Sequence, residues 1–92
     1  MISEDELIKH KWKYIPESKS WEKLGVSFKN TDRASNYYTL YFSGTLASSV
    51  HVLTLHALED SVRTGVSTIF SYKKYQADLS IKQKRTLKNW IL

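Results

Sequence analysis

The hydrophobic period of the chain changes near its midpoint, and this change constrains the fold more than any other feature. Residues 21–29, "WEKLGVSFK", and 36–43, "NYYTLYFS", alternate apolar and polar side chains, which is typical of half-buried strands. From Leu55 to about Tyr75, apolar residues recur every three or four positions, as on one face of a helix. The sequence therefore predicts an α+β two-layer domain, with helices on one face of an antiparallel sheet of three to four strands.

The two alternating runs are expected to form a hairpin across the loop sequence "NTDRAS". One register keeps a single face apolar, because it pairs Leu24 with Phe42, Val26 with Leu40, and Phe28 with Tyr38. In this register Tyr37 lies opposite Lys29, and Tyr41 lies opposite Gly25. The other face is predicted to remain uncovered, and its side chains are Trp21, Lys23, Lys29, Tyr37, Thr39 and Tyr41.

Three helices are predicted. Ser3 and Glu6 have the spacing of a capping box, so a short N-terminal helix should begin at Glu4. A long amphipathic helix follows from Leu55, and Gly65 within it indicates either a close approach to the sheet or a break. Ser80 is suited to cap a short basic C-terminal helix.

Three details of this layout follow from the pattern. Residues 49–55 fit either a central strand or the start of the long helix. Within that helix, Glu59 and Asp60 are expected to lie outside the apolar face. Residues 9–14, "KHKWKY", alternate as well, and their lysines suit an exposed edge strand.

Length and composition limit the classes of protein that the chain can represent. Residues 1–92 suffice for a single domain with one core. The absence of cysteine excludes disulfides, thiolate zinc sites and cysteine nucleophiles. No apolar run approaches the roughly 18 residues of a membrane span, and the N-terminal "MISEDEL" is acidic where a signal peptide is basic. We therefore expect a cytoplasmic protein that has no membrane partner.

The net charge of +5 comes entirely from residues 73–92. Eight Lys/Arg and eight Asp/Glu cancel in residues 1–72, whereas the last twenty residues hold six Lys/Arg and Asp78 alone. Such a cluster suits phosphates or an acidic protein groove, although a solvated outer face is the alternative. Four of these cations belong to the predicted C-terminal helix: Lys82, Lys84, Arg85 and Lys88.

The uncovered sheet face and the basic helix are the two candidate partner-binding surfaces. Aromatic rings among ammonium groups suit base stacking with nearby phosphate contacts. A purely structural role is the alternative, because Tyr across from Gly and Lys beside Tyr are familiar cross-strand pairs. The candidate partner-binding residues are Trp21, Lys23, Lys29, Tyr37, Tyr41, Lys82, Lys84, Arg85 and Lys88.

We expect a small non-catalytic binding protein, an inhibitor or regulator whose partner is another protein with an acidic surface. Nucleic-acid binding is the alternative, and a small metal-independent ribonuclease is the further alternative. A homodimer is also left open, because apolar patches often mark association. No cofactor and no metal site are predicted, since His10, His51 and His56 share no ligand spacing.

The order helix, three strands, helix resembles double-stranded RNA-binding domains at the level of topology. The resemblance implies RNA contacts from lysines at the start of the helix that follows the sheet. This sequence has Glu59 and Asp60 at that position, where a phosphate contact needs a base. We therefore do not assign the chain to that family.

Overall fold

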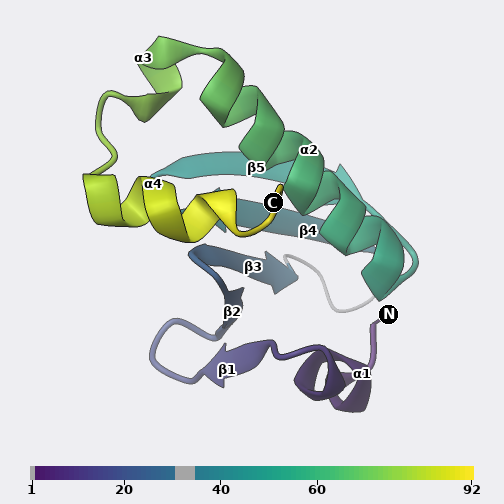
Figure 1. The fold of residues 1–92 in the computed structure, drawn as a ribbon. Coiled ribbons are helices and arrows are strands. Elements are labelled where there is room, and N and C mark those ends of the chain that lie inside the picture. Colours follow the sequence, from purple (N-terminus) through teal and green to yellow (C-terminus); the bar gives the residue numbers. More distant parts are fainter. Residues whose placement is uncertain (1, 31–34) are drawn as a thin grey trace.

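The computed structural model describes residues 2–30 and 35–92 (Figure 1). Five strands form one antiparallel sheet in the order β1-β2-β3-β4-β5, and the α+β class is confirmed with five strands rather than three to four. The strands are β1 (Lys13–Ile15), β2 (Ser20–Lys23), β3 (Val26–Asn30), β4 (Tyr37–Phe42) and β5 (Leu46–His51). The helices are α1 (Glu4–Lys9), α2 (Leu55–Ser71), α3 (Lys73–Gln76) and α4 (Ile81–Lys88).

The run at residues 21–29 is two strands and not one, so the prediction for it was wrong. Leu24 and Gly25 form a two-residue turn between β2 and β3, with φ of 48° and 79°. Two successive positive φ angles are typical of the type I′ turn, which matches the twist of the flanking strands. Trp21 is paired with Phe28, and Lys23 with Val26. Cross-strand partners point to the same face, so Trp21 and Lys23 lie on the apolar side of the sheet.

The register between β3 and β4 differs from the prediction by two residues. Val26 pairs with Phe42 and Phe28 with Leu40, while Leu24 lies in the turn and is exposed. A shift of two residues keeps every side chain on its face, so the apolar face was predicted correctly despite the wrong partners. Residues 31–34 of the predicted loop lie outside the described residues.

The partners predicted for the two outward tyrosines were therefore wrong. Tyr41 lies opposite Ser27, not Gly25, so no tyrosine covers the glycine. Tyr37 lies opposite His51, whereas Lys29 pairs with Thr39.

The ambiguity at residues 49–55 is resolved in two parts. β5 runs to His51, and α2 begins at Leu55 after Thr54, whose side chain accepts a hydrogen bond from the Ala57 N–H at 3.1 Å. The strand is at the edge of the sheet and not central.

Helix α2 lies directly against the sheet, and Gly65 makes this possible. A Cβ atom added to Gly65 would lie 2.4 Å from Cζ of Phe42 on β4. The helix continues through Gly65, so of the two predicted alternatives the close approach to the sheet is correct and the break in the helix is not. Five predicted apolar positions of α2 are buried: Leu55, Leu58, Val62, Val66 and Ile69.

The two terminal helices begin where their caps predict. The Ser3 hydroxyl accepts from the Glu6 N–H at 3.2 Å, and α1 starts at Glu4. Ser80 and Gln83 form a complete capping box at the start of α4. Helix α4 is anchored by Leu87, which is fully buried, and by Trp90, whose Nε1 donates to the Leu24 carbonyl at 3.1 Å.

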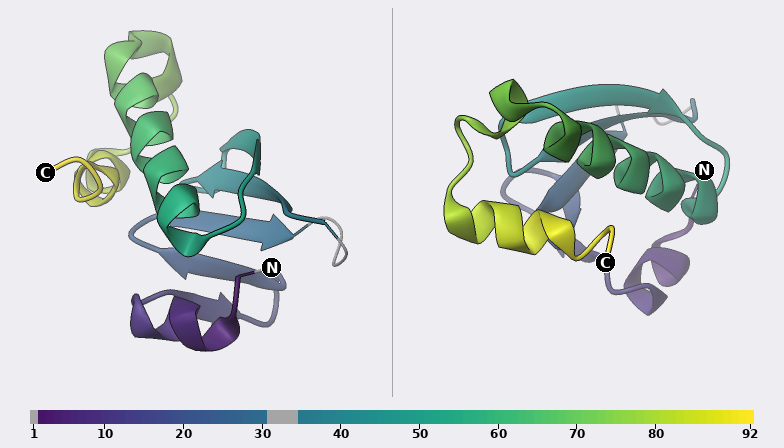
Figure 2. Two further views of the ribbon diagram at one scale, coloured as in Figure 1. Left: turned by 90° about the vertical axis from the view of Figure 1, so that its right-hand side faces the viewer. Right: turned by 45° about the horizontal axis from the view of Figure 1, so that its top comes forward.

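These contacts give a two-layer molecule. Helices α2 and α4 lie on one side of the sheet, as the left view of Figure 2 shows. Leu7 of α1 and Trp12, which directly precedes β1, belong to the same core. Within the described residues, the other sheet face has no helix packed against it.

Candidate binding surfaces

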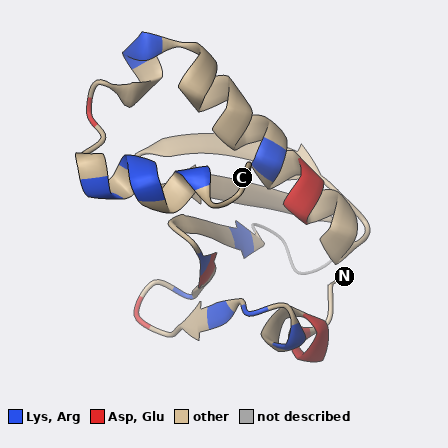
Figure 3. Ribbon diagram, in the orientation of Figure 1, with Lys and Arg blue, Asp and Glu red and all other residues tan. Residues whose placement is uncertain are grey.

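The nine residues predicted to bind a partner lie in three separate places. Trp21 and Lys23 belong to the interior side of the sheet. Lys29, Tyr37 and Tyr41 lie on its open face. The four basic residues of the C-terminal helix lie on α4, in the layer that covers the opposite face (Figures 1 and 3).

Lys23 is part of a largely buried ion pair with Glu59 of α2. Its Nζ lies 2.9 Å from Oε2 of Glu59, and the two side chains are only 20% and 10% exposed. The Trp12 Nε1–H donates to the same carboxylate at 3.1 Å. The predictions that Lys23 faces solvent and that Glu59 lies outside the buried face of α2 were both wrong.

Two indole rings complete the surroundings of Lys23. Its ammonium group lies 5.1 Å from the ring centroid of Trp90 and 5.9 Å from that of Trp12. Aromatic faces attract a cation electrostatically, so the pair is stabilised by rings as well as by the carboxylate. Lys23 thus connects β2, α2 and the C-terminal segment, and it has a structural role.

Burial raises the pKa of Glu59, but hydrogen bonds from Lys23 and Trp12, together with the charges of Lys23 and His10, more than offset it. The net pKa of Glu59 is therefore below its ordinary value of 4.5. The carboxylate is ionised at neutral pH, which agrees with the short contact to Lys23.

Trp21 is half-buried and packs against the core. Its ring centroid lies 5.3 Å from that of Tyr14 on β1. The ring is not part of the open sheet face, so the predicted cluster of Trp21 with Tyr37 and Tyr41 does not form. The positive φ of Leu24, next to Gly25, was the missed feature, and the glycine inside the alternating run was the signal that could have revealed the turn.

The open sheet face is polar and sparsely charged. Tyr37 is 55% exposed, and its ring lies 4.6 Å from the imidazole of His51, while Lys29 Nζ lies 5.8 Å from the ring of Tyr41. Small side chains lie between the rings, with Ser27 opposite Tyr41 and Thr39 opposite Ser49. Two rings and few cations make this face a weak site for a polyanion.

The helical layer carries the excess positive charge of the molecule. Basic residues gather along α3 and α4 in Figure 3. Lys82, Arg85 and Lys88 are exposed, and Lys84 is half-buried. Lys88 Nζ lies 5.4 Å from the ring of Phe70, a contact that orients the ammonium group without neutralising it.

Ion pairing does not neutralise this layer. In residues 2–30 and 35–92 the ion pairs are Lys23–Glu59, His56–Asp60 and Arg63–Asp60. None of them includes a cation from residues 73–92. The carboxylates of α2 are thus engaged with β2 and with α2 itself, and the charge of α3 and α4 is left for an external anion or for solvent.

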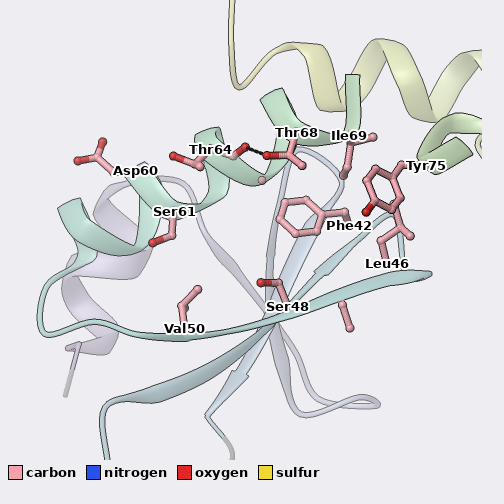
Figure 4. A pocket seen from close by; sticks show the side chains of 12 residues that line it. Phe42, Leu46, Ser48, Val50, Asp60, Ser61, Thr64, Thr68, Ile69 and Tyr75 are labelled. Atoms are coloured by element: carbon pink, nitrogen blue, oxygen red, sulfur yellow. Dashed lines mark hydrogen bonds between the residues drawn. The ribbon is translucent and has the colours of Figure 1, made fainter. Parts of the chain in front are cut away.

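A groove between β5 and α2 was not predicted. It has a volume of about 580 Å³, and its lining mixes hydroxyl, small and apolar side chains (Figure 4). Val50 lies near Asp60 and Ser61 at one end, whereas Leu46 lies near Ile69 and Tyr75 at the other. β5 and α2 therefore run in opposite directions along the groove. No local sequence signal could have identified it, because it depends on β5 being an edge strand.

The described part of the chain holds no group of three or more His, Asp or Glu side chains that could bind a metal ion. None of its helices has the length and apolar character needed to span a membrane.

Comparison with known proteins gives no relative: no family model matches the chain, and neither a curated protein nor a solved structure matches it. Any function must therefore be argued from the surfaces themselves.

Proposed function

We propose that this protein is a small non-catalytic binding protein, an inhibitor or regulator that docks on an acidic surface of another protein through its helical layer. The observation that carries the proposal is the set of basic residues on α3 and α4 that no described carboxylate neutralises. Clustered cations on a rigid element raise the association rate with an acidic partner and help to select it. The candidate contact residues are Lys73, Lys74, Lys82, Lys84, Arg85 and Lys88.

The open sheet face does not contribute to this contact. It lies on the other side of the sheet from α4, so one compact partner cannot touch Tyr37 and Arg85 together. The same separation argues against a short nucleic-acid strand with phosphates on α4 and bases stacked on Tyr37 and Tyr41. Nucleic-acid binding by the helical layer alone is a distinct outcome, which salt dependence identifies.

Affinity capture from a nuclease-treated extract of the source cell tests the proposal. Wild-type protein is compared with Lys84→Glu/Arg85→Glu and with Lys13→Glu/Lys29→Glu, a matched reversal of two exposed lysines of the sheet. The proposal expects an acidic protein that the wild type and the sheet variant retain and the α4 variant loses. Retention by all three proteins would refute it.

Mixed-sequence RNA and DNA provide the second arm. Four phosphate contacts would lower affinity on the order of 100-fold between 50 and 200 mM salt. Binding with that slope, lost in Lys84→Glu/Arg85→Glu, would identify nucleic acid as the partner and overturn the protein-partner assignment. Cleavage of the RNA during incubation would overturn the non-catalytic assignment.

A further inference from the structure

The β5 edge lacks the features that usually block strand pairing. Among the described strands β5 has a neighbour, β4, on one side only. Its sequence, Leu46 to His51, holds no Lys, Arg, Asp, Glu or Pro, although natural edge strands commonly use charge, proline or a bulge to prevent association. The opposite edge differs, because β1 has three residues, includes Lys13, and is followed by Pro16.

The main chain of β5 has an ordered set of groups that face outward. The Val52 N–H donates to the Asn36 carbonyl at 3.0 Å, so the main-chain groups of Val52 face the β4 side. Hydrogen-bonding positions alternate in antiparallel pairs, and Val50, Ser48 and Leu46 therefore also face β4. The N–H and C=O groups of Ala47, Ser49 and His51 point away from the sheet, where another strand can pair with them.

We propose that a second copy of this chain occupies the edge, with the two β5 strands antiparallel about a two-fold axis at Ser49. β5 is complementary to itself in this register, because Ala47 faces His51, Ser48 faces Val50, and no like charges are opposed. The result is a continuous ten-stranded sheet, twice the five strands of one copy. In such a dimer both β5 edges are paired, so no β5 edge remains for a third copy to bind.

The groove beside β5 supports the choice of a second copy. Asp60 lies at the Val50 end of the groove, and α3 adjoins the Leu46 end through Tyr75 (Figure 4). Antiparallel pairing brings the Leu46 end of one copy beside the Val50 end of the other. Lys73 and Lys74 of one α3 then lie on the side of the partner's Asp60. Asp60 also pairs with His56 and Arg63 of its own helix, but its side chain is 58% exposed, so a lysine of the second copy can approach it.

The dimer also has a consequence for the helical layers. A two-fold axis perpendicular to the sheet keeps both copies of α2, α3 and α4 on the same side. The inference goes beyond the proposed function and shares with it only Lys73 and Lys74. The variants at Ser49 test the dimer and Lys84→Glu/Arg85→Glu tests the helical layer, so either proposal can fail without the other.

Sedimentation equilibrium of the full chain, extended to the millimolar range, tests the proposal. Ser49→Lys places two lysines opposite each other on the axis and should weaken dimerisation by about two- to fivefold, because like charges directly opposite are destabilising. Ser27→Lys is the matched control, since Ser27 lies on the same sheet face but on β3, where its cross-strand partners are Glu22 and Tyr41. It should leave the dimer unchanged, and far-UV circular dichroism checks that both variants fold.

Cysteine cross-linking tests the register. The natural chain has no cysteine, so Ser49→Cys introduces a single thiol. Facing residues that exchange hydrogen bonds have Cα atoms about 5.5 Å apart, within the range of a disulfide. Oxidised Ser49→Cys should become a covalent dimer, and Thr39→Cys should not, because its copies would be about 14 Å apart, three strand spacings.

Three outcomes overturn the proposal: a monomer at all concentrations, a dimer that Ser49→Lys does not weaken, or a dimer that Ser27→Lys weakens equally. A monomer at all concentrations would mean that the β5 edge is open to an extended segment of a different protein. Equal weakening by the control variant would indicate association through the open sheet face.

Discussion

Replacing Lys23 with Met should show that the Lys23–Glu59 pair holds the two layers together. The substitution keeps most of the length of the side chain but leaves the Glu59 carboxylate buried, and among the described residues Trp12 is then its hydrogen-bond donor. Removing one partner of a buried pair costs about 3 to 5 kcal/mol. Because the Lys23 side chain is 20% exposed and water reaches it, we expect a cost below this range, about 2 to 3 kcal/mol.

A second substitution separates the charge effect from packing. Glu59→Gln removes the negative charge, so it should destabilise the wild type, in which it breaks the ion pair. In the Lys23→Met background the same change should stabilise the protein, because it removes an unpaired buried charge. A change in the sign of the effect of Glu59→Gln on the free energy of unfolding would show that residues 23 and 59 are energetically coupled. Loss of packing alone does not produce it.

Urea unfolding followed by tryptophan fluorescence measures all four proteins. Lys29→Met is the control, since Lys29 is exposed on the open sheet face, and it should change the free energy of unfolding by less than about 0.5 kcal/mol. The reasoning is refuted if Lys23→Met is as stable as the control, or if Glu59→Gln destabilises both backgrounds equally.

Three further outcomes follow from the packing. Since the pKa of Glu59 is lowered on folding, its contribution to stability is present above pH 4.5 and is lost as pH falls through the folded value. The urea midpoints of the wild type and Glu59→Gln should therefore converge as the pH is lowered below 4.5, and a constant difference would contradict this. Gly65→Ala should destabilise by roughly 1 kcal/mol in thermal or urea unfolding, because overpacking against Phe42 outweighs the gain in helix propensity; stabilisation instead would mean that the ring moves freely. Leu87→Ala should lower the free energy of unfolding by about 2 to 5 kcal/mol, and fluorescence and circular dichroism should still report one transition. Two transitions would mean that α4 unfolds separately from the rest of the domain.

Elements specified by local chemistry could be predicted from the sequence. The starts of α1 and α4 depend on Ser3 and Ser80, whose side chains cap the next turn of their own helix. The buried face of α2 follows from a helical period that does not depend on the rest of the fold. Gly65 was identified as a close contact or a break because glycine inside a helix requires a reason.

The strand region could be predicted only in part, because its faces depend on turns. Alternation extends through Leu24 and Gly25 without interruption, so periodicity alone reads residues 21–29 as one strand. A two-residue turn changes the parity of the faces, and Trp21 and Lys23 consequently point inward with Phe28 and Val26. In β4 no turn intervenes, and Tyr38, Leu40 and Phe42 are buried as the pattern predicts.

The solvent exposure predicted for Lys23 and Glu59 was wrong for both residues, because the burial of each charge depends on the other. A pattern method places a charged residue outside, and burial becomes favourable only when an opposite charge is within reach. The partners are 36 residues apart, and the turn at Leu24 determines whether they meet. The same argument distinguishes the cations of residues 73–92, which have Asp78 as their only acid in that segment, while Glu59 and Asp60 already have partners. No ion pair of the described residues neutralises their charge as Glu59 neutralises that of Lys23, so it is left to solvent or to an anion outside the chain.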